Sequence, residues 1–120
     1  MSEKNLLNER RVGDVLIATV ESSELTSGVA DTLLERLREL MAAGQAAKLV
    51  LDLSNVKFID SVALGSLVVL LRRVKEAQGR LALSGLTGHC LRVMEVTGLQ
   101  RVFQLHPDVP AATEALQSPG

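Results

Sequence analysis

Residues 48–74 have the sequence KLVLDLSNVKFIDSVALGSLVVLLRRV, and this stretch decides the fold. Its first part, residues 48–53, is a short run dense in Val and Leu, which is typical of a strand buried on both faces. Its last part, residues 64–74, has apolar residues at helical spacing. We therefore predict a central strand and then a helix, with the acidic serine step Asp60-Ser61 at the point where the helix begins.

The predicted helix carries two apolar rows instead of one. The first row follows the i, i+3, i+4 rule and is expected to face the sheet: Leu64, Leu67, Val68, Leu71 and Val74. The second row has the same spacing and lies beside Ser61: Val62, Gly65, Ser66 and Val69. Either neighbouring helices cover this second row, or it is a docking face on which the small residues permit a partner to approach closely.

Ser61 itself has two interpretations. As a helix cap, its hydroxyl or the carboxylate of Asp60 would accept a backbone N–H that the first turn cannot satisfy internally. As a switch, Ser61 would carry a phosphate, whose charge of about −1.5 to −2 is favoured by the positive end of the helix dipole. Residue type alone favours the cap, because Ser and Asp are the ordinary capping residues.

The rest of the chain alternates strands and helices. Residues 5–11 and 15–20 are predicted strands, and the turn Gly13-Asp14 between them favours an antiparallel hairpin. An amphipathic helix is predicted from Thr26 to Gly44, with the apolar stripe Ala30, Leu33, Leu37, Leu40 and Met41. A strand at 80–84, a helix at 87–97 ended by Gly98, a strand at 101–104 and a helix at 108–116 complete the pattern. This alternation predicts a single α/β domain with a mostly parallel sheet flanked by helices.

The composition of the chain argues against several functional classes. The 120 residues carry a formal net charge of −1, so a general attraction to nucleic acid or to an anionic membrane is not expected. No apolar run approaches the roughly 18 residues of a membrane span, and the charged N-terminal segment lacks an apolar signal core. We expect a cytoplasmic protein without membrane insertion. The lone Cys90 excludes an intrachain disulfide and is expected to be a small core residue.

The sequence gives little support for a catalytic site. His89 and His106 have no Cys, Asp or Glu partners at metal-ligand spacing. The turn GLTG at residues 85–88 lacks the lysine and the glycine spacing of a P-loop, and we interpret it as a strand-to-helix turn. We expect neither an enzyme nor a bound metal or cofactor.

The chain resembles the STAS domain, the fold shared by bacterial anti-sigma factor antagonists and the cytoplasmic tails of sulphate transporters. The resemblance rests on LVLDL at 49–53, VKFIDS at 56–61, Leu64-Gly65, GRLALSG at 79–85, and LRVMEVTGL at 91–99 followed by Val102-Phe103. It covers roughly residues 15–116 and implies one STAS-like domain over 1–120, with a core at about 12–117. It further implies that Ser61 is the phosphorylation site and that a partner contacts the position of Thr26. Together with the docking interpretation of the second row, the predicted partner-binding residues are Thr26, Asp60, Val62, Gly65, Ser66 and Val69.

By this resemblance the function is that of an anti-sigma factor antagonist. The unmodified protein would sequester an anti-sigma serine kinase and so release a sigma factor; phosphorylation of Ser61 would end the interaction and a serine phosphatase would reset it. Antagonists usually have Ser or Thr and then Gly after Asp-Ser, where this chain has Val62-Ala63, and Thr26 stands where they have Asp. These differences leave open a constitutive assembly subunit of a stress-signalling scaffold or lipid-transport complex. Self-association also stays open.

Overall fold

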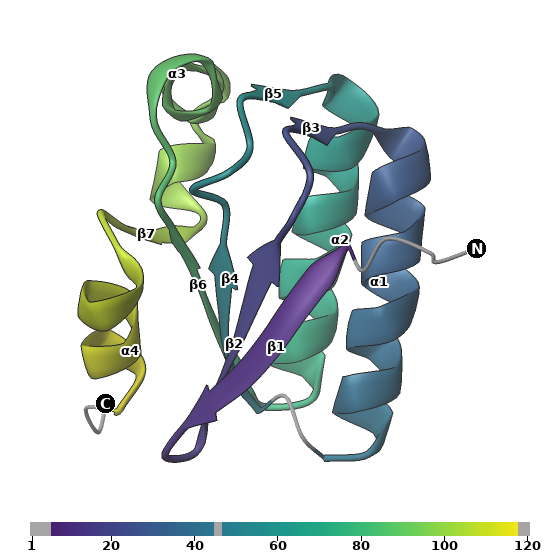
Figure 1. Cartoon of the computed structure of the whole chain (residues 1–120), viewed down its shortest axis with the longest axis vertical. Helices are drawn as coiled ribbons and strands as arrows, with labels where there is room; N and C mark the ends of the chain where they lie inside the picture. The colour runs from purple at the N-terminus through teal and green to yellow at the C-terminus, as the bar shows by residue number, and fades with distance from the viewer. Residues whose placement is uncertain (1–5, 45–46, 118–120) are drawn as a thin grey trace.

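The computed structural model describes residues 6–44 and 47–117, which form a five-stranded sheet with helices on both faces (Figure 1). In chain order the elements are β1 (Leu7–Val12), β2 (Val15–Val20), β3 (Glu24–Leu25), α1 (Ser27–Ala42), β4 (Lys48–Asp52), β5 (Phe58–Ile59), α2 (Ser61–Glu76), β6 (Arg80–Ser84), α3 (Gly88–Thr97), the 3-10 turn η1 (Leu99–Arg101), β7 (Gln104–His106) and α4 (Val109–Gln117). Asn5, expected in the first strand, lies outside the described residues.

The main sheet has the strand order β1-β2-β4-β6-β7. β1 and β2 pair antiparallel, from Val12 opposite Val15 to Leu7 opposite Val20, which confirms the expected hairpin. The other neighbours pair in parallel, as β–helix–β connections require. The predicted α/β fold with a mostly parallel, mixed sheet is therefore confirmed.

Two apolar cores lie on opposite faces of this sheet. Along β2, Leu16, Ala18 and Val20 belong to the larger core, which α1, α2 and α3 cover. Val15 and Ile17 point to the other face, where the smaller core packs against Ala112 and Leu116 of α4. Because side chains alternate between the two faces of a strand, a strand covered on both sides is apolar at nearly every position. The predicted burial of the central strands follows from this arrangement.

The buried face of α2 differs from the predicted one. Leu67, Leu71 and Val74 are buried as expected, but Leu64 and Val68 are only partly buried. Ala63 and Leu70, which were not in the predicted row, are buried instead. The helix is thus rotated toward Ala63 and Leu70, because α1 packs beside it and covers part of the face that the second row was expected to occupy.

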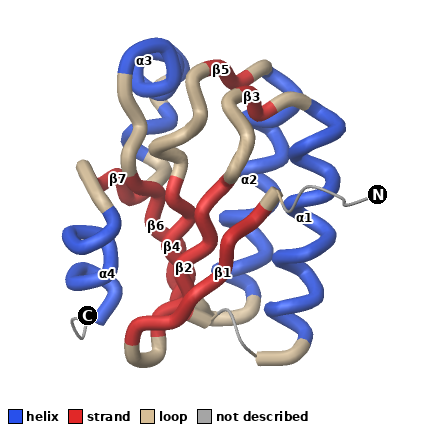
Figure 2. Tube along the Cα trace, in the orientation of Figure 1, coloured by secondary structure: helices blue, strands red, loops and turns tan. Residues whose placement is uncertain are grey.

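Three further elements differ from the sequence prediction. The last strand lies at Gln104–His106 instead of 101–104, because Gly98 adopts a left-handed φ of 76° and the chain then makes the turn η1 before it can pair with β6. Phe103 is buried although it precedes the strand. The short strands β3 and β5, which the sequence analysis did not predict, pair in parallel apart from the main sheet (Figure 2).

Candidate functional site

The β3–β5 pair brings the starts of α1 and α2 together beyond the carboxyl ends of β2 and β4 (Figure 1). Leu25 pairs with Ile59, and both side chains are buried in the larger core. The backbone N–H of Asp60 then donates to the carbonyl of Leu25 at 3.2 Å. As a result Thr26, the residue before α1, lies beside Asp60, the residue before α2.

Asp60, and not Ser61, caps α2. Its backbone is extended, with φ −95° and ψ 172°, and its Oδ1 accepts the backbone N–H of Ala63 at 2.8 Å. This is the ordinary geometry of an N-cap, so of the two capping groups proposed from the sequence the carboxylate of Asp60 is confirmed, and the hydroxyl of Ser61 is not the cap. Ser61 is the first residue of the helix and is exposed. Within the described part of the chain its hydroxyl forms no hydrogen bond.

The segment between β4 and α2, which leads to Ser61, is fixed at several points. At its start, the two carboxylate oxygens of Asp52 accept the backbone N–H of Ser54 and the hydroxyl of Thr19, both at 3.1 Å. In its middle, the thiol of Cys90 donates to the carbonyl of Val56 at 3.6 Å. The N–H of Lys57 donates to the carbonyl of Ser23 at 2.7 Å. Burial raises the pKa of the Cys90 thiol, as expected for a core cysteine.

The second apolar row of α2 reaches the surface. Val62 is 56% exposed and Val69 is 37% exposed, so the proposal that neighbouring helices cover them is wrong. Gly65 is also exposed, and no atom lies within 4 Å of the position that a Cβ would take there. The packing of this chain therefore does not require glycine at that position. Ser66 is half-buried, because it lines the narrow space between α1 and α2.

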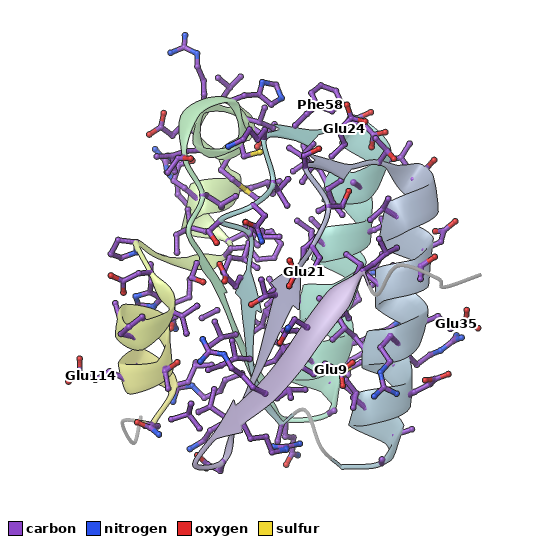
Figure 3. All side chains as sticks on the ribbon, in the orientation of Figure 1. Glu9, Glu21, Glu24, Glu35, Phe58 and Glu114 are labelled. Atoms are coloured by element: carbon purple, nitrogen blue, oxygen red, sulfur yellow. The ribbon has the colours of Figure 1, made fainter. Side chains whose placement is uncertain are left out.

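Phe58 also reaches the surface at the end of the molecule where α2 begins, and it was not among the predicted site residues. It is 44% exposed and lies next to Glu24 on β3, at the end of the molecule where α2 begins (Figure 3). Its ring stacks on the ring of His89, with 5.2 Å between centroids and 11° between planes. The signal available in the sequence was an aromatic residue three positions before Ser61, in a chain with two aromatic residues.

Thr26 occupies the N-cap position of α1 and is half-buried. Its backbone carbonyl accepts the N–H of Ala30 at 2.8 Å, but its side chain makes no capping hydrogen bond. The structure thus brings together Thr26, Asp60, Ser61 and Val62 where α1 and α2 start, whereas Gly65 and Ser66 lie about one turn, and Val69 about two turns, further along α2. Thr26, Asp60, Ser61 and Val62 form one end of the site, and Gly65, Ser66 and Val69 extend it.

The described residues contain no group of three His, Cys, Asp or Glu side chains that could hold a metal ion. His106 contacts Gln104, with 3.0 Å between Nε2 and Oε1, and His89 stacks on Phe58. None of the helices in the described ranges combines the length and hydropathy of a membrane-spanning segment.

This chain belongs to the STAS domain family, whose model matches residues 8–112. It is 30% identical over 67 residues to the anti-sigma-B factor antagonist of Listeria monocytogenes, which covers 56% of this chain and 59% of that protein. The match therefore spans less than two thirds of that relative. The anti-sigma-B factor antagonist of Bacillus subtilis is 34% identical over 76 residues, covering 63% of this chain and 68% of the relative.

Solved structures show the same fold. An anti-sigma factor antagonist from Mycobacterium paratuberculosis superposes with a TM-score of 0.77 at 26% identity, covering 93% of each chain. The anti-sigma factor antagonist SpoIIAA in its unphosphorylated form has a TM-score of 0.69 at 12% identity, covering 91% of this chain and 94% of that one. At that identity the likeness to SpoIIAA concerns the fold alone.

Proposed function

We propose that this chain is an anti-sigma factor antagonist that works as a partner switch controlled by phosphorylation of Ser61. The unmodified protein binds an anti-sigma serine kinase through the surface that includes Thr26, Asp60, Val62, Gly65, Ser66 and Val69. The kinase transfers the γ-phosphoryl group of ATP to Oγ of Ser61, whose proton is lost as ADP leaves. A serine phosphatase hydrolyses the phosphoserine with water and so restores binding.

The observation that carries this proposal is the division of roles between Asp60 and Ser61. Asp60 satisfies the N–H of the first turn, so the fold does not use the Ser61 hydroxyl. An exposed hydroxyl at the first position of a helix is accessible to a kinase, and its modification leaves the capping bond intact. The names of the relatives, anti-sigma-B factor antagonists in two genera, support the same function.

The effect of the phosphate is expected at the interface and not in the fold. The helix N-terminus favours an added negative charge, so α2 should persist. Val62 is the neighbour of Ser61 and is more than half exposed, so a partner that covers it must also desolvate the phosphate. The carboxylate of Asp60 adds like charge at the same point. Phosphorylation should therefore weaken binding while the domain stays folded.

The test uses the purified chain, a cognate anti-sigma kinase and ATP. Mass spectrometry should find one phosphate, located at Ser61, and Ser61→Ala should abolish it. The affinity for the kinase should fall by at least about tenfold after stoichiometric phosphorylation, which corresponds to about 1.4 kcal/mol. The far-UV circular dichroism spectrum should not change. Phosphate at another residue, or equal affinity before and after modification, would contradict the proposal.

Two substitutions test the docking surface separately from the phosphate. Val62→Asp and Val69→Asp should weaken kinase binding and leave the thermal midpoint nearly unchanged, because exposed substitutions alter stability by no more than about 0.5 kcal/mol. Val96, which is 75% exposed on α3, offers a matched control. Val96→Asp should change neither property. Unfolding of the Val62 variant would instead assign that residue to the core.

The second candidate function is a constitutive assembly subunit. It is favoured by the apolar residues Phe58, Val62 and Val69, which are exposed in the unmodified chain and would serve an assembly contact without any switch. Thr26 stands where antagonists have an acidic residue, and this difference also favours an assembly subunit. In this case Val62→Asp would still disrupt the complex, but Ser61→Asp would not. Comparing these two variants against the same partner decides between the functions.

A further inference from the structure

A surface groove of about 310 Å³ runs between α1 and α2. Its apolar lining comes from Leu34, Met41, Val69 and the buried Leu70. Leu34 and Met41 are half-buried and Val69 is 37% exposed, so apolar area stays in contact with solvent along the groove. Four charged side chains also line it: Asp31, Glu35 and Arg38 from α1, and Arg73 from α2.

The acidic residues come before the arginines along the groove: Asp31 lies about two helical turns before Arg38, and Glu35 about one turn before it, within reach of Arg38. α1 and α2 start side by side from the paired strands β3 and β5 and run in the same direction (Figure 1). Arg38 is twelve residues after the Thr26 cap and Arg73 is thirteen residues after the Asp60 cap, so the two arginines lie at nearly the same level. The midpoint of Asp31 and Glu35 lies about 8 Å nearer the helix N-termini, at 1.5 Å per residue.

These charges are weakly paired within the chain. Arg38 Nη2 is 3.9 Å from Glu35 Oε2, and both side chains are more than 60% exposed. Such an exposed pair contributes little and exchanges partners easily. Among the described residues, neither Asp31 nor Arg73 forms an ion pair.

We propose that the groove between α1 and α2 is a self-association surface, and that its occupant is a second copy of this chain. A two-fold axis that passes between the two charge levels, perpendicular to the helices, places the acidic level of each copy against the basic level of the other. Asp31 and Glu35 then face the arginines of the second copy, and the same contacts recur by symmetry. The apolar lining of both grooves is covered at the same time.

Self-complementarity is what selects a second copy over another partner. A groove of one charge sign would favour a partner of the opposite sign. This groove has acidic side chains nearer the helix N-termini and arginines further along, so a copy of the groove turned by a two-fold rotation is complementary to it. Val69 belongs both to this groove and to the proposed docking surface for the kinase. Self-association and kinase binding therefore compete for Val69, although the self-association itself does not depend on the proposed function.

The test is sedimentation equilibrium of the purified chain alone, at low salt and over a range of concentrations up to about 1 mM, the scale of weak association. The unmodified chain should form dimers. Asp31→Arg with Glu35→Arg makes the groove wholly basic, and Arg38→Glu with Arg73→Glu makes it wholly acidic. Each double variant should have a dimer Kd at least about tenfold higher than that of the unmodified chain, because like charges meet at both levels.

Mixing the two variants in equal amounts should restore the dimer, because opposite charges then meet at both levels. The matched controls change net charge equally on exposed residues outside the groove: Glu76→Arg with Glu95→Arg, and Arg72→Glu with Arg92→Glu. Each control should dimerise like the unmodified chain. A monomeric unmodified chain, failure of the mixture to associate, or an equal effect of the controls would overturn the proposal.

Discussion

At the scale of single residues, the site depends on two neighbours with different tasks. Asp60 accepts the N–H of Ala63 and fixes where α2 begins, whereas Ser61 leaves its hydroxyl in solvent. The sequence alone could not separate these tasks, because Asp and Ser are both good capping residues and stand side by side. The decision comes from the backbone: the N–H of Asp60 donates to the carbonyl of Leu25 next to the β3–β5 pair, and Asp60 is thereby held in an extended conformation.

This division predicts unequal effects of alanine substitution. Asp60→Ala should lower the free energy of unfolding by about 0.5–2 kcal/mol, because the Ala63 N–H loses its partner. Ser61→Ala should change it by no more than about 0.5 kcal/mol. Urea denaturation of both variants checks the difference. A larger loss for Ser61→Ala than for Asp60→Ala would return the capping role to Ser61.

At the scale of the elements, long periodic segments were predictable and short ones were not. α1 and the strands β2, β4 and β6 were predicted nearly to the residue, since each has many apolar positions in one clear pattern. β3 and β5 have two residues each, one buried and one exposed, and so show no period. The last strand was misplaced because Val102-Phe103 has strand composition, whereas Phe103 is a buried anchor before β7.

The rotation of α2 can be tested with paired substitutions. Leu67 is 5% exposed, so Leu67→Ala should cost about 2–5 kcal/mol. Leu64 lies one turn earlier and is only half-buried, so Leu64→Ala should cost less than Leu67→Ala. Chemical denaturation of both variants provides the measurement. Equal losses would mean that α2 presents the predicted face and not the observed one.

An ion pair joins the hairpin to α1, and it leads to a prediction of how stability depends on pH. Glu9 of β1 faces α1 (Figure 3), and Arg36 Nε of α1 lies 2.6 Å from Glu9 Oε2. This hydrogen bond is the main cause that lowers the pKa of Glu9 below its ordinary 4.5. A carboxyl group whose folded pKa is lowered stabilises the fold above its unfolded pKa, and this contribution is lost as pH falls through the folded pKa.

Glu9→Gln should therefore reduce the loss of stability on acidification below about pH 4.5 and lower stability modestly at pH 7. Urea denaturation at a series of pH values compares the variant with the unmodified chain. Glu35→Gln is the control, because Glu35 is exposed and its contact with Arg38 is long. A Glu9→Gln profile that runs parallel to that of the unmodified chain at every pH would show that the pair does not couple to folding.

At the scale of the whole molecule, the sheet separates two cores that should respond independently. Ile17 lies in the smaller core under α4, and Ile59 lies in the larger core under α1 and α2. Each Ile→Val substitution removes one methyl group and should cost about 0.5–1.5 kcal/mol. Because the two cores share no buried side chain among the described residues, the double variant should lose the sum of the two costs within about 0.5 kcal/mol. Leu25 and Ile59 are register partners within one core, so Leu25→Ala with Ile59→Val should depart from additivity by about 0.5–3 kcal/mol. Double-mutant cycles by chemical denaturation measure both pairs.

Strong coupling between Ile17 and Ile59 would contradict independent cores. It would mean that the sheet transmits strain from one core to the other, and a substitution under α4 would then be able to alter the site at Ser61.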